Sequence, residues 1–306
     1  MRVLTDDDLD RLVERFIEAA RMAWEAGFAF VDIKHCHGYL LHEFLSAYTR
    51  PGPYGGSFEN RTRLLREIIA GIRASGNKID LGVRLSAFDL VPFRPDPALS
   101  APGKPGPGIP EDFSHCLPYK YAFGVNQNNP IEPDLNETVR FIGECAHLGV
   151  KLINLSAGSP YYNPHIQRPA AYPPSDGYQP PNDPLIDVAR QIHAVRQLRA
   201  VAPPQIAIIG TAYSYLQEYL PHVAQALLRE NWVDLIGLGR MTLSYPEILS
   251  DAAQNRPLTP KLICRTFSDC TTAPRNGLPS GCYPLDKHYA QKPEATALKD
   301  IKRVRE

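Results

Sequence analysis

The stretch AGFAFVDIKHCHGYLLHEFLSAYTRPGPYGGSFENRTRLLREII, residues 26–69, decides the fold. Residues 28–33, FAFVDI, form an apolar run that predicts a buried strand, and Gly27 just before them ends the preceding helix. A helix is predicted over residues 58–74, with Ser57 as its capping residue. A buried strand followed by a helix is the unit from which parallel sheets covered by helices are built.

The same alternation of strand and helix continues to about residue 255. The further predicted strands are residues 81–87, 151–157, 206–212 and 233–239. The further predicted helices are residues 135–147, 184–200, 215–230 and 245–255, besides a first helix that begins near Thr5. Five strand–helix units in series fit either a doubly wound open sheet or part of a (β/α)8 barrel.

The connections favour the barrel. Those that precede the strands are short, whereas two that follow strands are long, residues 88–132 and 158–183. Barrels build their active sites from loops at the carboxyl ends of the strands, and the dinucleotide fingerprint G-x-G-x-x-G is absent from the sequence. We therefore predict a partial TIM (β/α)8 barrel over residues 1–258, with long loops on its C-terminal face, and a cysteine-containing loop and tail over residues 259–306.

Composition excludes several classes of protein. The 33 basic and 33 acidic residues give no net charge and no basic stripe, so nucleic acid is not an expected partner. No apolar run reaches membrane-spanning length and the N-terminus does not resemble a signal peptide, so we expect a cytoplasmic protein with no membrane partner. Six cysteines among 306 residues do not form a disulfide scaffold.

The run KHCHGY, residues 34–39, gathers titratable side chains at the end of the first strand. With His42, it offers the residue types that bind metals. Alternation along a strand would put His35 and His37 on one face and Cys36 on the other, and the H-E-x-x-H helix pattern is absent, so no metal is expected. Polar residues at a strand end are common. So many titratable side chains at the carboxyl end of a barrel strand, however, indicate a catalytic site.

The opening stretch resembles the core signature of the Old Yellow Enzyme family. YGGSFENR, residues 54–61, is its most specific part, and the resemblance continues through GVRLSA at 82–87, NLSAGS at 154–159 and DLIGLGRMTLSYPE at 234–247. Members are FMN-dependent NADH:flavin oxidoreductases with a (β/α)8 barrel. The resemblance implies bound FMN, NADH or NADPH as reductant, and a small-molecule substrate such as an activated alkene or a related acceptor, as in ene-reductases.

The resemblance also implies residue roles. The family has a His, a His or Asn three positions later and a Tyr two further on, and this sequence has Lys34, His37 and Tyr39 there. The first two would hold the oxygen of the acceptor and Tyr39 would supply a proton. The implied flavin contacts, including the cradle for the phosphate, are Arg84, Ser156, Gly158, Gly210, Thr211, Ala212, Gly239 and Arg240.

Lys34 departs from the family pattern, because the family has a histidine there. A compact cation would favour a carboxylate or another anionic oxygen, or chemistry other than enone reduction. It disfavours the alternative activity, oxidative N-demethylation of an amine. The two long loops are expected over the mouth of the active site, either contacting substrate or only packing as a lid or interface. The candidate substrate contacts are Tyr161, Tyr162, His165 and Arg168.

The first three βα units of the family have no counterpart in this sequence, so the predicted strands are strands 4 to 8 of the barrel. We expect either an N-terminally truncated product, with a start site placed too late, or a second chain that completes the barrel. A third reading is a non-catalytic half-barrel remnant or subunit. An open piece would leave its strand edges and pocket incomplete, so this chain alone is expected to bind FMN weakly or not at all.

Three cysteines resemble a cluster loop of the branch that contains dienoyl-CoA reductase and trimethylamine dehydrogenase. That branch carries a [4Fe-4S] cluster on C-x2-C-x3-C-x11-C. Cys270 and Cys282 keep the last spacing, but Thr266 takes the second position and Cys264 is one residue out of step. Because a cluster needs four thiolates, the pattern favours free thiols over a cluster, or over a structural zinc that adds His288.

Overall fold

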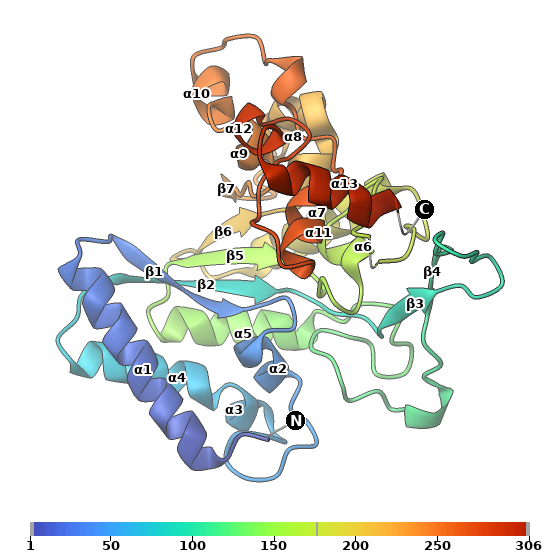
Figure 1. Cartoon of the computed structure of the whole chain (residues 1–306). Helices are drawn as coiled ribbons and strands as arrows, with labels where there is room; N and C mark the ends of the chain where they lie inside the picture. The colour runs from blue at the N-terminus through green and yellow to red at the C-terminus, as the bar shows by residue number, and fades with distance from the viewer. Residues whose placement is uncertain (1–2, 176, 304–306) are drawn as a thin grey trace.

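A five-stranded parallel sheet forms the centre of the computed structural model, which describes residues 3–175 and 177–303 (Figure 1). The strands are β1 (Phe30–His35), β2 (Asp80–Ser86), β5 (Leu152–Ser156), β6 (Ala207–Gly210) and β7 (Leu235–Ile236). Their order in space, β1-β2-β5-β6-β7, is their order in the sequence, as in consecutive strands of a barrel. The predicted partial α/β barrel is confirmed.

The helices between the strands cover one face of the sheet, and α1, α4 and α5 lie side by side below β1 and β2 in Figure 1. The α-helices are α1 (Asp6–Glu25), α2 (Leu40–Leu45), α3 (Phe58–Arg61), α4 (Arg63–Ala74), α5 (Asn136–His147), α6 (Pro164–Gln167), α7 (Pro184–Val201), α8 (Leu220–Arg229), α9 (Met241–Ser244), α10 (Ile248–Ala253), α11 (Asp269–Arg275), α12 (Lys287–Ala290) and α13 (Pro293–Arg303). The described residues also form the 3₁₀ helices Ser114–Cys116, Tyr213–Tyr219 and Pro260–Leu262.

Strand register separates the two faces of the sheet. Ile33, Val83, Ile153 and Ile208 are register partners across four strands, and each is at most 3% exposed against the helices. Burial of each such side chain stabilises the fold by roughly 1.5–3 kcal/mol. The next residue along every strand points to the opposite face, because side chains alternate along a strand.

That opposite face, the interior side of a barrel, is incompletely covered. Phe30 at one edge is 49% exposed and Leu235 at the other is 47% exposed. The outermost strands β1 and β7 each pair with one neighbour only among the described residues. The sheet therefore presents an open inner face and two strand edges, as a barrel piece does.

Two predicted helices are divided in the structure. The predicted helix at 58–74 consists of α3 and α4, which meet at Thr62, where φ is −99° and ψ is 0°. Ser57 caps α3 as predicted, by accepting a hydrogen bond from the Asn60 amide. The predicted helix at 215–230 begins as the 3₁₀ helix Tyr213–Tyr219 and becomes α8 after Gln217, whose φ of 52° interrupts the helical path.

The two long loops contain short ordered elements that the sequence did not reveal. The first loop forms an antiparallel hairpin of β3 (Phe93–Pro95) and β4 (Gly108–Pro110). The second loop contains α6. The amide of Phe93 donates to the carbonyl of Tyr162 at 2.8 Å, so the two loops are held together over the carboxyl ends of the strands.

The motif YGGSFENR has a structural explanation. The guanidinium of Arg61, which is 3% exposed, donates to the carbonyls of Leu45 and Gly56 and makes a bidentate pair with Glu137 of α5. Its carbon atom Cζ lies 3.7 Å from the centre of the Tyr48 ring. Arg61 therefore joins two loop turns to a neighbouring helix, and it does not line the cavity described below.

Gly124 occupies a position that only glycine suits. Its φ is +70°, and a Cβ atom there would lie 2.6 Å from the Ala87 carbonyl oxygen and 2.8 Å from Phe88 Cα. We expect Gly124→Ala to lower the free energy of unfolding by about 2–4 kcal/mol, from left-handed strain and overpacking. Gly143→Ala is the matched control, because nothing lies within 4 Å of that Cβ in α5. Equal urea midpoints for the two variants would contradict this account.

The segment after β7 packs back onto the barrel piece. Ile263 and Cys264 join the main core, while a small cluster of its own holds α11 against α13. The rings of Phe267 and Tyr172 stack with centroids 5.5 Å apart, so this segment also contacts the second long loop. No helix within the described ranges is long and apolar enough to cross a membrane.

Candidate active site

A cavity of about 610 Å³ lies at the carboxyl ends of the strands, between the second long loop and α11. Strands β2 and β5 supply its base, and the loops after β6 and β7 supply one wall. Nine of the predicted site residues line it: Tyr39, Arg84, Ser156, Tyr161, Arg168, Thr211, Ala212, Gly239 and Arg240. No aspartate or glutamate is present among its described lining residues.

A polar row crosses the inner face of the sheet beneath this cavity. Lys34, Arg84 and Asn154 are register partners on β1, β2 and β5. Arg84 Nε and Asn154 Oδ1 are buried and have no hydrogen-bond partner in the described part of the chain. Because an unpaired buried polar atom is costly, these two atoms indicate that a polar ligand completes the site.

The loops after β6 and β7 form a second polar region. Ala212 has a φ of 77°, which turns the backbone sharply after β6, and Thr211 Oγ1 donates to the Leu155 carbonyl at 2.7 Å. Arg240 Nη1 is buried without a hydrogen-bond partner among the described residues. Burial, followed by the neighbouring Arg168, lowers the pKa of Arg240 to about 9. A basic group held this way is stabilised by an anion.

Tyr39 and Tyr161 meet at the mouth of the cavity. Their hydroxyl groups are 3.2 Å apart, and the Lys34 Nζ lies 3.2 Å from the centre of the Tyr39 ring. The hydrogen bond with Tyr161, followed by burial, raises the pKa of Tyr39. Tyr39 is therefore a protonated phenol at neutral pH that lies beside a cation.

His37 lies behind the cavity wall. Its Nε2 is 2.7 Å from Ser156 Oγ and 3.4 Å from Gln167 Nε2, and both of those residues line the cavity. Burial, with smaller effects of Arg84 and Lys34, lowers the pKa of His37 to about 3, so the ring is neutral.

The expected alternation of His35 and His37 on one face is wrong. β1 ends at His35, and His37 has a φ of 65°, so strand geometry does not extend to it. The His35 ring packs 5.6 Å from the ring of Phe141, on the helix side of the sheet.

Besides Lys34 and His37, four predicted site residues do not line the cavity. Gly158 and Gly210 shape the backbone, since Cβ atoms there would lie 2.5 Å from Asn163 Oδ1 and 2.2 Å from the Tyr213 hydroxyl. His165 is buried, with its Nδ1 2.7 Å from the Tyr178 hydroxyl. Tyr162 is 40% exposed in the same loop.

None of the three C-terminal cysteines forms a disulfide bond within the described residues. Cys264 is buried, Cys270 lines the cavity and Cys282 is half-buried. Within the described ranges, no group of three or more His, Cys, Asp or Glu side chains is placed to hold a metal ion.

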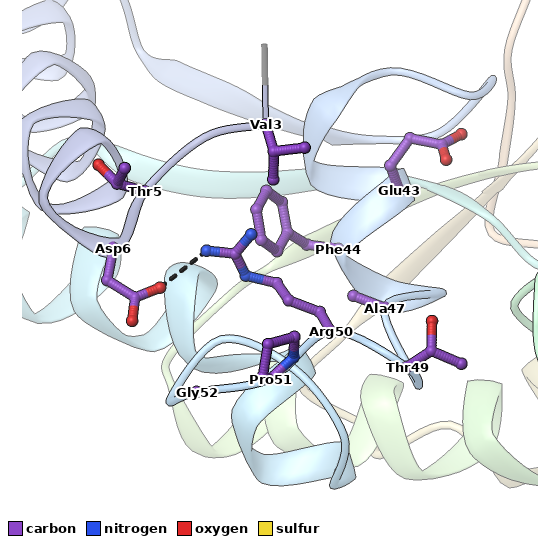
Figure 2. A pocket seen from close by; sticks show the side chains of 10 residues that line it. All are labelled: Val3, Thr5, Asp6, Glu43, Phe44, Ala47, Thr49, Arg50, Pro51 and Gly52. Carbon is purple, nitrogen blue, oxygen red and sulfur yellow. Dashed lines mark hydrogen bonds and ion pairs between the residues drawn. The ribbon is translucent and has the colours of Figure 1, made fainter. Parts of the chain in front are cut away.

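A second cavity, of about 660 Å³, lies between the start of α1, α2 and the following loop (Figure 2). Arg50 reaches across it to pair with Asp6 at 2.7 Å and to donate to the Leu4 carbonyl at 3.0 Å. The ring of Phe44 and the side chain of Val3 supply apolar surface beside this pair. None of the predicted site residues lies there, so the first cavity is the candidate active site.

Eleven of the lining residues were not predicted as site residues, and six of these carry a hydroxyl, amide or guanidinium group. Asn154 could have been predicted as a site residue, because it is the register partner on β5 of Arg84 on β2. Arg275 and Thr271 could not have been predicted, because they lie in the tail at residues 259–306, which was expected to be separate from the barrel. The others are Gln167, Tyr213 and Ser214.

Comparisons with known proteins find similarity in part of the sequence and in the fold. Residues 1–96 match the NADH:flavin oxidoreductase / NADH oxidase family. The NADH-dependent flavin oxidoreductase iccE of Talaromyces variabilis is 49% identical over 75 residues, 24% of this chain and 18% of that protein. The NADPH dehydrogenase of Geobacillus sp. (strain WCH70) is 44% identical over 91 residues, 29% of this chain and 26% of that protein. The predicted resemblance to the Old Yellow Enzyme family is thus confirmed for residues 1–96.

One solved structure extends the similarity of fold to most of the chain. A 2-naphthoyl-CoA reductase complex matches 96% of this chain and 36% of that chain, with a TM-score of 0.64 and 19% sequence identity. At that identity the match establishes the fold alone. In each of these three comparisons, the matched region spans well under two thirds of the other protein.

Proposed function

We propose that this chain carries the FMN and acceptor half of a flavin oxidoreductase active site, with the cavity above β2 and β5 as the site. The observation that carries the proposal is the set of buried, unpartnered polar atoms of Arg84, Asn154 and Arg240 within that one cavity. An FMN molecule has a ring edge with donors and acceptors and a phosphate, so two guanidinium donors and one amide acceptor fit it at both ends.

The proposed binding places each part of FMN beside residues that suit its charge. Arg84 and Asn154 would hold the polar edge of the isoalloxazine ring. Arg240, with the backbone at Gly239 and Ala212, would hold the phosphate. Bound FMN supplies hydride transfer, accepting from NADH or NADPH and donating to the acceptor.

The residues at the mouth would serve the acceptor. Tyr39 is protonated at neutral pH and reaches the cavity, so it would give a proton to the carbon next to the one that receives hydride. The ammonium of Lys34 would stabilise negative charge that develops on the acceptor oxygen. Neutral His37 would orient Ser156 from behind. An activated alkene fits these roles.

The charge of the cavity bears on the alternative activity, oxidation of an amine. Two arginines in its described lining, Arg84 and Arg240, each have a buried guanidinium nitrogen without a hydrogen-bond partner among the described residues. A cationic amine would be repelled there, so reduction of an uncharged or anionic acceptor is favoured over amine oxidation.

We also propose that three further βα units complete the barrel, either from a longer form of this chain or from a second chain. The support is the open inner face, where Phe30 and Leu235 are about half exposed at the two outer strands. Without those units, FMN would be contacted only by the residues of this chain. We therefore expect its dissociation constant from this chain alone to be on the order of 100 μM.

Titration with FMN, followed by flavin fluorescence, tests the proposal. We expect Arg240→Ala and Arg84→Ala each to weaken binding by about tenfold or more, because each removes a charge-assisted contact. Arg265→Ala is the matched control, since Arg265 pairs with Glu218 outside the cavity. Circular dichroism verifies that each variant is folded. Folded Arg240→Ala protein with unchanged FMN affinity would refute the phosphate assignment.

A further inference from the structure

We infer that Lys34 is a positioning residue for Tyr39. Its ammonium, which lies against the face of the Tyr39 ring, holds that ring at the mouth of the cavity and stabilises the phenolate that remains once Tyr39 has given up its proton. The inference rests on the proposed function, because it takes Tyr39 to be the proton donor. It adds to the proposed effect of Lys34 on the acceptor oxygen a second effect, on the donor itself.

A left-handed turn brings the ring of Tyr39 over the side chain of Lys34. Lys34 lies near the end of β1, and the strand is followed by His37 and Gly38, whose φ angles are 65° and 68°. The His37 amide donates to Ser86 Oγ at 3.0 Å, which ties this turn to β2. The backbone that carries the Tyr39 ring is therefore fixed to the neighbouring strand.

The ammonium of Lys34 reaches the cavity across the Tyr39 ring. Lys34 Nζ lies 3.2 Å from the centre of that ring, and Tyr39 lines the cavity whereas Lys34 does not. The negative face of an aromatic ring attracts a cation, so this contact restrains the ring. Arg84, the register partner of Lys34 on β2, adds a second positive charge beneath the cavity. A neighbouring cation favours the ionised form of a phenol.

Tyr161 acts on the hydroxyl end of Tyr39, with the opposite sign. The two hydroxyls are 3.2 Å apart, and this hydrogen bond, followed by burial, raises the pKa of Tyr39. Cys36 adds a smaller effect in the same direction. The Cζ atom of Arg275 lies 5.9 Å from the centre of the Tyr161 ring. Tyr161 thus favours the protonated phenol, whereas Lys34 favours the phenolate.

The proton transfer that this arrangement serves is balanced. The O–H bond of Tyr39 breaks as a C–H bond forms on the acceptor carbon next to the one that receives hydride. The negative charge of the acceptor passes to the phenol oxygen, beside the ammonium of Lys34. Water then returns a proton to Tyr39, which is 45% exposed.

The experiment is a fluorine NMR titration of the full chain without flavin, with difluorotyrosine in place of tyrosine. The fluorinated phenol ionises near neutral pH, where lysine side chains in general are charged. Tyr39→Phe identifies the Tyr39 signal by its loss. Circular dichroism verifies that each variant is folded.

Lys34→Gln is expected to raise the pKa of the fluorinated Tyr39 by about one pKa unit, because the phenolate loses its neighbouring cation. Lys34→Met removes the same charge from a side chain of similar length and should give the same result. Lys34→Arg keeps a cation there, so the pKa of Tyr39 should stay near that of wild-type protein. Lys151→Gln is the matched control, because Lys151 pairs with Asp80 at the amino ends of β5 and β2.

Two results would overturn the inference. One is an unchanged pKa of Tyr39 in both neutral variants, and the other is an equal rise in Lys34→Arg and Lys34→Gln, since packing and not charge would then be responsible. Tyr161→Phe should lower the pKa of Tyr39, and a rise there would contradict the opposing effects. The titration contains no flavin, so its failure leaves the proposed function standing, whereas failure of FMN to bind wild-type protein overturns the proposed function.

Discussion

Acidification from about pH 7.5 to about pH 5 is expected to lower the free energy of unfolding by about 4 kcal/mol. Four of the nine histidines are buried: His35, His37, His42 and His165. Burial lowers the pKa of His35 to about 4 and the pKa of each of the other three to about 3. These rings stay neutral in the fold while the unfolded chain takes up protons.

The fall in the free energy of unfolding follows from the lowered pKa values of the four histidines. A histidine whose pKa is lowered on folding has no effect on stability well above the unfolded pKa near 6.5, where the ring is neutral in both states. Below that pH, protonation of the unfolded chain destabilises the fold increasingly as pH falls. Each of the four loses about 2 kcal/mol at pH 5. Two buried carboxyls act oppositely, because burial raises the pKa of Asp89 to about 7 and that of Asp187 to about 6. Together the two carboxyls raise the free energy of unfolding by about 4 kcal/mol over the same pH range. The loss from the four histidines is larger, so the net change is a loss of stability.

Urea unfolding at several pH values between about 7.5 and 5 measures this effect. His35→Phe removes one titrating ring beside Phe141 and should reduce the loss by about 2 kcal/mol. His115→Gln is the control, because His115 is exposed in the first long loop. If the free energy of unfolding of wild-type protein stays constant or rises towards pH 5, the buried histidines do not outweigh the two buried carboxyls, and the prediction is wrong.

Arg61→Ala is expected to lower the free energy of unfolding by about 3–5 kcal/mol. The substitution removes both hydrogen bonds to the carbonyls of Leu45 and Gly56 and leaves Glu137, which is 32% exposed, without its bidentate partner. Loss of the stacked guanidinium also opens space beside Tyr48. Buried acceptors without donors account for most of the expected loss.

Arg140→Ala is the matched control for this prediction. Arg140 pairs with Glu59 of the same motif, but the two side chains are 55% and 59% exposed. Exposed pairs contribute at most about 1 kcal/mol. We therefore expect the urea midpoint of Arg140→Ala to stay near that of wild-type protein, and a comparable fall in both variants would contradict a structural role specific to Arg61.

The sheet was predictable because each strand is marked by its own local pattern. Apolar runs such as residues 81–87 specify a strand wherever they are placed in the fold, and short connections fix the parallel order. Helix ends with side-chain caps, such as Thr5 and Ser57, were equally accessible. The break at Thr62 was not, because the residues on both sides keep a helical pattern.

The site was predictable only in part, for a related physical reason. Arg84 lies within β2 and Arg240 in the loop after β7, and the predicted order of the strands brings both into the lining of one cavity. The prediction that His37 shares a strand face with His35 was wrong, because the left-handed φ of His37 ends the alternation of side chains along β1. Arg275 depends on a tail that folds back over the loop after β5, and no local pattern records such a long-range contact.

The affinity of wild-type protein for FMN relative to riboflavin tests the central claim most directly. Riboflavin lacks the phosphate, so the ratio isolates the contribution of the proposed cradle at Arg240. The account predicts that FMN binds at least about tenfold more tightly, with a dissociation constant on the order of 100 μM for this chain alone. Equal affinities for the two flavins, or no binding of either at about 1 mM, would contradict it.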